Sequence, residues 1–307
     1  MATCIKSMAA TWEADATVEC VDILRGAKMD LSRSKVRQSY LDRIQAGDFD
    51  AILLSPPCSS FSRATFANHR GPRPVRCYQS PRGMDTLTSR ERDKAILGNI
   101  FADFAWEVAT LVADGAASFL AFEQPEDLGT IAKGPRAGER PASMWQWPQL
   151  RQLLDKGLRT VAFHQATFGT PYAKPTRLLL RTPVSLPEGV LEGPPTFDAE
   201  GYYEGPLPSG KPFGGMLQRK ATGGSEQWPP RLCQWLAAAL VHTCLASATT
   251  RQSPTRVPQR IFPLEEASAP QDAGKRALGT QDTKELEREA FRMAAGGEQG
   301  CRLAKDE

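Results

Sequence analysis

The alternation of short apolar runs with amphipathic stretches constrains the fold of this chain more than any other feature. Apolar runs occupy residues 18–23, 49–54 and 118–122, while residues 36–46 and 89–114 have the apolar spacing of helices. A short apolar run bounded by turn-forming residues is typical of a buried parallel strand. Strands that alternate with helices in this way form a βαβ rhythm, which predicts an α/β fold.

The same pattern continues less regularly toward the C-terminus. It predicts a helix over 144–156, strands over 159–165 and 177–181, and a helix over 230–245. Together with the preceding elements, these segments predict one domain over residues 1–245.

Two segments depart from the pattern. Residues 183–224 are dominated by Pro and Gly, which indicates a small, loop-rich recognition lobe inside the domain. Residues 246–307 combine Pro, Ser, Gln and charged residues with few large apolar side chains, a composition that predicts a disordered tail. Within this tail, residues 284–293 have the spacing of one isolated helix.

Overall charge and cysteine usage exclude several classes of protein. The 38 basic and 35 acidic residues leave a net charge of +3, so any nucleic-acid surface must be local. The N-terminal residues lack the apolar region of a secretory signal, and we expect a soluble intracellular protein without a membrane partner. The 7 cysteines lack paired CxxC spacing, which argues against a disulfide framework or a structural zinc site. Cys58, His69 and Cys77 could bind a metal only if the fold happened to bring them together, so no metal is expected.

Reactive side chains follow two of the predicted strands. Cys58 comes after the run 49–54 and the dipeptide Pro56-Pro57, and Glu123 comes directly after the run 118–122. Open α/β sheets bind ligands at the carboxyl ends of their strands, and consecutive prolines stiffen a loop. The alternatives are structural, since a lone cysteine is often a small buried apolar residue and a glutamate can cap a turn.

Four ordered motifs resemble those of DNA cytosine-5 methyltransferases, and specifically the compact branch found in phages and mobile elements. The chain has PPCSSFS at 56–62, EQP at 123–125, FGTPYAKPT at 168–176 and WPPRLC at 228–233. The second motif has Gln124 where the family usually has Asn. The resemblance extends over about residues 18–245 and implies a Rossmann-like sheet that methylates cytosine with S-adenosylmethionine.

In this family, the cysteine thiolate adds to carbon 6 of cytosine and thereby makes carbon 5 nucleophilic. The resemblance assigns that role to Cys58, and it assigns to Glu123 the contact with nitrogen 3 and the amino group of the ring. Because the target base is buried in a duplex, such an enzyme flips it out of the helix. DNA is the expected partner, RNA remains open because the chemistry is similar, and no protein partner can be inferred. The expected substrate contacts are Arg63, Arg73, Arg76, Lys174 and Arg177.

The cofactor side matches the family less well. Members begin with a strand and a Gly-rich FxGxG turn, and nothing before Val18 supplies it, so the sheet is expected to lack its first strand. The remaining cofactor contacts implied by the resemblance are Asp22, Asp30 and Pro56, although both acids could simply serve turns. Two hypotheses follow. The chain is either an active methyltransferase or a catalytically impaired, nucleic-acid-associated remnant of one.

Overall fold

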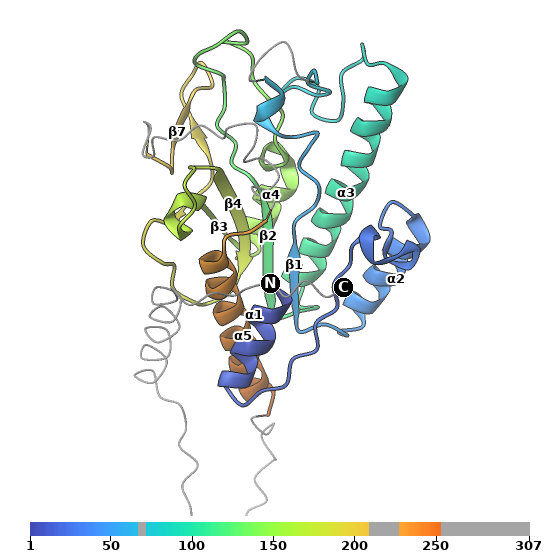
Figure 1. The fold of residues 1–307 in the computed structure, drawn as a ribbon, viewed down its shortest axis with the longest axis vertical. Coiled ribbons are helices and arrows are strands. Elements are labelled where there is room, and N and C mark those ends of the chain that lie inside the picture. Colours follow the sequence, from blue (N-terminus) through green and yellow to red (C-terminus); the bar gives the residue numbers. More distant parts are fainter. Residues whose placement is uncertain (67–71, 209–226, 253–307) are drawn as a thin grey trace, which may run out of the picture.

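A mixed five-stranded sheet forms the centre of the protein (Figure 1). The computed structural model describes residues 1–66, 72–208 and 227–252. The sheet has the order β1-β2-β4-β3-β5. Its strands are β1 (Ala51–Leu54), β2 (Phe119–Pro125), β3 (Arg159–His164), β4 (Pro175–Arg181) and β5 (Leu191–Glu192). Strand β1 pairs with β2 in parallel, and β4 lies antiparallel between β2 and β3.

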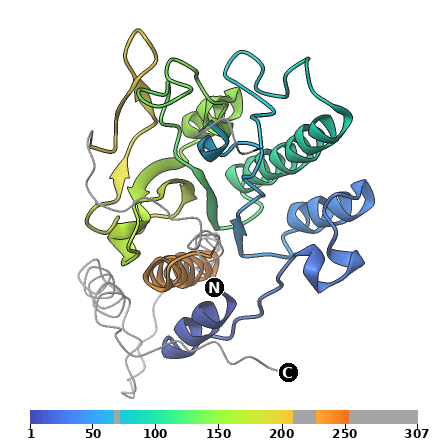
Figure 2. The same cartoon turned by 45° about the horizontal axis from the view of Figure 1, so that its top comes forward.

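Helices cover both faces of this sheet (Figure 2). Alternate residues of β2 define the two faces, with Leu120 and Phe122 in one apolar cluster and Phe119 and Ala121 in the other. The first cluster contains α2 (Ser34–Gln45), α3 (Ser89–Ala113) and α4 (Pro148–Asp155), and the second contains α1 (Ala2–Thr11) and α5 (Pro230–Gln252). This three-layer α/β arrangement is compatible with a Rossmann-like fold.

Most of the predicted elements are confirmed to within a few residues. The helix predicted over 89–114 begins where Thr88 and Glu91 form a reciprocal capping box. The helix predicted over 144–156 is divided into a 3₁₀ turn, Met144–Gln146, and α4. Trp147 lies between them in an extended conformation, because the ring of Pro148 disfavours a helical residue before it.

The strand predicted over 18–23 is wrong. Side chains alternate between exposed and half-buried from Thr11 to Cys20, as in a strand, but the segment pairs with no strand among the described residues. Instead, Glu19 holds the segment to α2 through Tyr40 at 2.6 Å and Arg43 at 2.9 Å. In the described part of the sheet, β1 is consequently an edge strand, and all its residues are only half-buried.

The structure differs from the prediction at the two ends of the described sequence. Helix α1 was not predicted, and it packs against α5 with Ile5 and Ala9 buried. Helix α5 extends to Gln252, so the prediction that a tail begins at 246 is wrong for residues 246–252. The remainder of that tail, including 284–293, lies outside the described residues.

The loop-rich lobe predicted over 183–224 contains little regular structure up to residue 208. It contributes β5 to the main sheet and then the hairpin of β6 (Thr196–Phe197) and β7 (Tyr203–Gly205). Residues 209–226 lie outside the described part.

Helices α3 and α5 are long and apolar enough to cross a membrane by length and composition alone. However, 50% and 56% of their most apolar windows are buried inside the protein, where they pack on the two faces of the sheet. This test gives only weak evidence for a membrane span, because core helices of soluble proteins meet it too.

Candidate active site

Two hydrogen bonds join the loop after β1 to the end of β2. The Ser55 hydroxyl donates to Glu123 Oε2 at 2.7 Å, and Gln124 Nε2 donates to the Pro56 carbonyl at 2.6 Å. Leu54 and Phe122 are partners in the parallel register, so both loops leave the same edge of the sheet. The loop that carries Cys58 and the end of β2 that carries Glu123 therefore lie side by side.

The Cys58 loop is exposed at its tip and anchored on its far side. Cys58 is exposed, and its carbonyl accepts a hydrogen bond from the Phe61 amide at 2.9 Å. The Phe61 ring is 6% exposed and packs edge-to-face against Trp147. The alternative interpretation of Cys58 as a buried apolar residue is therefore wrong, and the loop can present a thiol to a ligand.

Glu123 and Gln124 are buried beside this loop. Glu123 is 7% exposed and Gln124 is 1% exposed, and Gln124 Oε1 has no hydrogen-bond partner. A cavity of about 10 Å³ lies against Gln124, and its other lining residues include Phe61, Arg63, Glu126 and Met144. This is about the space for one water molecule. Neither Cys58 nor Glu123 is among the lining residues of this cavity. A thiol and a carboxyl group on neighbouring segments of one sheet edge can in principle bond covalently to a flat ring and hydrogen-bond its polar edge.

Arg63 lies beside this cavity, but backbone groups already bind its guanidinium. It donates hydrogen bonds to the carbonyls of Gly129 and Thr130, and burial lowers the pKa of Arg63. Gly129 has φ of +60°, and a Cβ there would lie 2.3 Å from the Gly201 carbonyl oxygen. Arg63 therefore links the Cys58 loop to the Gly129 segment, and Gly129 in turn packs closely against the β6–β7 hairpin.

The predictions for Arg76 and Arg177 as DNA contacts need correction, since both side chains belong to the core. Arg76 is 1% exposed, and its guanidinium donates to Ser60, Asn99 and the carbonyls of Pro81 and Ala95. Burial lowers the pKa of Arg76 to about 10. Arg177 is 0% exposed. Neither guanidinium is placed to contact a phosphate.

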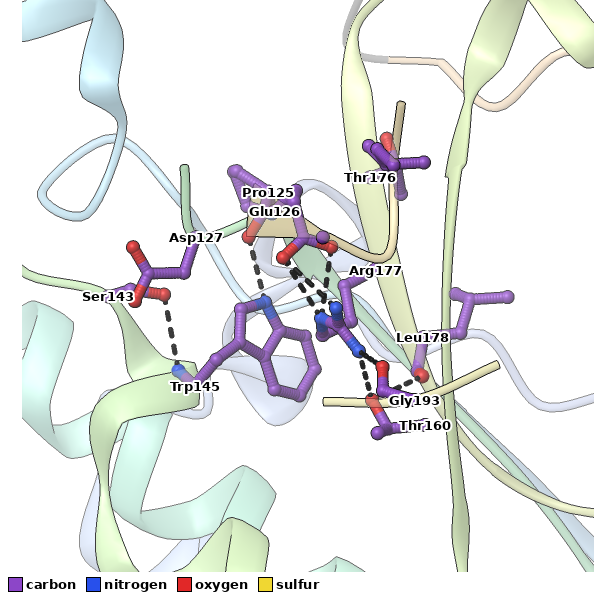
Figure 3. Close-up of polar contacts among 12 residues, drawn as sticks. Pro125, Glu126, Asp127, Ser143, Trp145, Thr160, Thr176, Arg177, Leu178 and Gly193 are labelled. Carbon is purple, nitrogen blue, oxygen red and sulfur yellow. Dashed lines mark hydrogen bonds and ion pairs between the residues drawn. The ribbon is translucent and has the colours of Figure 1, made fainter. Parts of the chain in front are cut away.

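Arg177 instead forms a buried ion pair with Glu126 (Figure 3). Its Nε lies 3.0 Å from Glu126 Oε2 and its Nη2 donates to Oε1 at 3.1 Å. Its Nη1 donates to Thr160 on β3 and to the Gly193 carbonyl. Through these bonds and the pair with Glu126, the Arg177 side chain on β4 links β3 to the end of β2. Burial raises the pKa of Glu126 to about 7, against the attraction of Arg177.

Asp127 is the second acid of this segment and is also buried. It accepts hydrogen bonds from the Gly129 amide and from Gln146 Nε2, each at 2.9 Å. Burial raises the pKa of Asp127 although these bonds lower it. Nearby, Trp145 Nε1 donates to the Pro125 carbonyl at 2.8 Å and holds the end of β2 in place (Figure 3).

Arg73 and Lys174 remain candidate substrate contacts. Arg73 is 44% exposed and pairs with Glu91 at 2.7 Å, so a phosphate would have to compete with this carboxylate. Lys174 has φ of +37°, and its carbonyl accepts hydrogen bonds from the Gln165 amide and the Thr176 hydroxyl. Both residues therefore have structural contacts that the sequence did not reveal.

The residues predicted to bind S-adenosylmethionine do not form a complete site for it. Asp22 accepts from the Leu24 amide and Asp30 from the Ser32 amide, each at 2.9 Å, so each caps its own turn. Hydrogen bonds from Ser32 lower the pKa of Asp30. The adjacent Leu24 is 91% exposed, and no Gly-rich turn follows a strand beside β1 in the described part. The Pro56 carbonyl already accepts a hydrogen bond from the Gln124 side chain.

The described residues contain no group of three or more His, Cys, Asp or Glu side chains that could hold a metal ion. His69, one member of the weighed metal set, lies outside them. No family model, curated protein or solved structure matches this chain. The function is therefore argued from the residues of the site.

Two features of the site were missed from sequence. Ser55 is the first residue after β1, and Glu123 is the first residue after the apolar run 118–122. These equivalent positions could have indicated that the two side chains are neighbours. For the Glu126–Arg177 pair, the signal was a pair of consecutive acids directly after a buried strand. The sequence does not predict which residue either side chain contacts, because the partners lie 68 and 51 positions away along the chain.

Proposed function

We propose that this chain is the catalytic part of a DNA cytosine-5 methyltransferase, with Cys58 as the nucleophile and Glu123 as the acid. The observation that carries the proposal is the pair of hydrogen bonds that ties the Cys58 loop to Glu123 and Gln124. It joins the two motifs of the resemblance at the carboxyl ends of adjacent parallel strands, where α/β sheets bind ligands.

The chemistry begins with attack of the Cys58 thiolate on carbon 6 of a flipped cytosine. A hydrogen bond from Glu123 to nitrogen 3 stabilises the charge that develops on the ring. The ring becomes an enamine, and its carbon 5 can then bond to an electrophile. Loss of the hydrogen on carbon 5 as a proton and departure of the thiolate restore the aromatic ring. In the family, S-adenosylmethionine supplies the methyl group; the residues described here account for the activation of carbon 5.

Carbon 5 activation can be tested without any cofactor, on DNA that carries tritium at carbon 5 of cytosine. After the thiolate adds, carbon 5 takes a proton from water, and on elimination it releases the tritium to the solvent. We expect the wild-type protein to release tritium about 10² to 10⁴ times faster than Glu123→Gln, which removes the acid. The readout is the initial rate of tritium release into water.

The control for this test is Glu107→Gln, which alters an exposed acid on α3, outside the lobe. Equal rates for Glu123→Gln and the wild-type protein would remove Glu123 from the mechanism, and no release by the wild-type protein would reject the function. RNA with the same label decides between the two nucleic acids, since the faster polymer is the substrate class.

The second candidate is a nucleic-acid-associated remnant that lacks methyl transfer. The use of Asp22 and Asp30 as turn caps favours it. Several missing pocket contacts, each worth about 1 to 3 kcal/mol, predict a dissociation constant for S-adenosylmethionine weaker than about 1 mM. Titration calorimetry measures this directly. Micromolar binding would reject the remnant and show that the described segments do form a cofactor site.

A fusion provides the matched comparison for that titration. Placing a strand and an FxGxG turn ahead of Val18 supplies the backbone that the family uses to approach the cofactor, and we expect it to restore binding. The same fusion with Val in place of the turn glycines is the control, because a Cβ would block that approach.

A further inference from the structure

Ser55 has one contact that the roles of Cys58 and Glu123 do not explain. Its hydroxyl donates to Glu123 Oε2 at 2.7 Å, the usual length of an O–H···O hydrogen bond. Ser55 itself is exposed, whereas the Glu123 carboxyl group lies in a residue that is 7% exposed. An exposed residue therefore donates a partly buried hydrogen bond to a buried acid.

This contact restrains the orientation of the acid. Torsion about the last bond of a glutamate side chain is soft, so an unrestrained carboxyl group samples a broad range of orientations. With Oε2 held by Ser55, Oε1 is left for the polar edge of a ligand. On the opposite strand, Gln124 holds the Pro56 carbonyl two residues before Cys58. The two bonds together restrain both reacting groups.

We propose that Ser55 is a positioning residue that orients the Glu123 carboxyl group toward the target base. The inference rests on the function proposed above. Ser55 acts only through Glu123, so its loss should lower the turnover number and leave the affinity for DNA unchanged. Removing the Ser55 hydroxyl leaves Glu123 Oε2 without this donor, which also lowers stability. The readout that separates a positioning role from a structural one is therefore the turnover number at unchanged affinity for DNA.

Ser55→Thr and Ser55→Val form a matched pair for the test. Their side chains have the same shape, and only Thr retains the hydroxyl. In the tritium-release assay we expect Ser55→Val to lower the turnover number by about 10 to 100-fold, since small misplacements of a catalytic group have effects of this size. Ser55→Thr should stay within about threefold of the wild-type protein, because it keeps the donor. The Michaelis constant for DNA should be the same in both variants, measured at a temperature where both are fully folded.

Two outcomes would overturn the proposal. Equal turnover by the Val and Thr variants would show that the hydroxyl has no positioning role. If the wild-type protein releases no tritium, the proposed function fails, and crystal structures of the wild-type protein and Ser55→Val then decide the role of Ser55 separately. A Glu123 carboxyl group in the same orientation in both structures would reject the proposal, and a rotated one would support it.

Discussion

Replacing Cys58 by Ser should lower the release of tritium from carbon 5 of cytosine by about a thousandfold or more, in line with the loss of a catalytic nucleophile in other enzymes. A thiol forms a thiolate near neutral pH, whereas a serine hydroxyl does not ionise there and is a far weaker nucleophile. The measurement is the initial rate of tritium release at saturating DNA.

Cys77→Ser is the matched control for this variant. Cys77 is half-buried, and the contacts of its loop with Ser80 use backbone atoms that the substitution keeps. We expect Cys77→Ser to retain nearly the full rate and Cys58→Ser to unfold at the same temperature as the wild-type protein. A Cys58→Ser protein that still released tritium at the wild-type rate would exclude Cys58 as the nucleophile.

Replacing Arg177 by Met should lower the free energy of unfolding by about 3 to 5 kcal/mol, because it leaves the Glu126 carboxyl group buried without its ion-pair partner. Urea denaturation measures the change. The control is Lys156→Met, whose exposed pair with Asp114 should contribute less than about 1 kcal/mol. An Arg177→Met protein as stable as Lys156→Met would contradict a structural role for the buried pair.

The effect of Arg177→Met should also depend on pH. Burial raises the pKa of Glu126 to about 7 in the folded protein, above its ordinary value near 4.5. An acid with a raised pKa binds more protons when folded, so its contribution to stability is complete below pH 4.5 and is lost as the pH rises toward 7. Without the attraction of Arg177, the pKa of Glu126 in the folded protein rises further, so the loss should continue to higher pH and be larger in total. We therefore expect the variant to be less impaired at pH 5 than at pH 8.

The strands that carry the candidate site could be predicted because their signals are local. The runs ending at Leu54 and Phe122 are short, apolar and bounded by polar residues, and both became buried or half-buried strands of the sheet. Their neighbouring position followed from the α/β rule that places reactive loops at one edge. The roles of Cys58 and Glu123 remain predictions, which the two rate measurements test.

The errors arose where non-local contacts decide the structure. Residues 18–23 have the alternation of a strand, but strand pairing needs a neighbour that the pattern cannot supply. An arginine in sequence is equally compatible with a phosphate contact and a buried ion pair. For Arg177, the decision depends on Glu126, which lies 51 residues away. Helix α1 was missed because its small apolar face acquires a partner only in α5.

The packing of α1 on α5 has a consequence for the synthesis of this chain on the ribosome. Ile5 and Ala9 share their apolar cluster with Leu236 and Leu240, so that layer cannot close until more than 200 further residues have been translated. Strand β4 is likewise needed to join β2 to β3. Contacts this distant in sequence slow folding and leave apolar surface exposed in the meantime. Nascent chains that stop before α5 should therefore be the ones that chaperones bind.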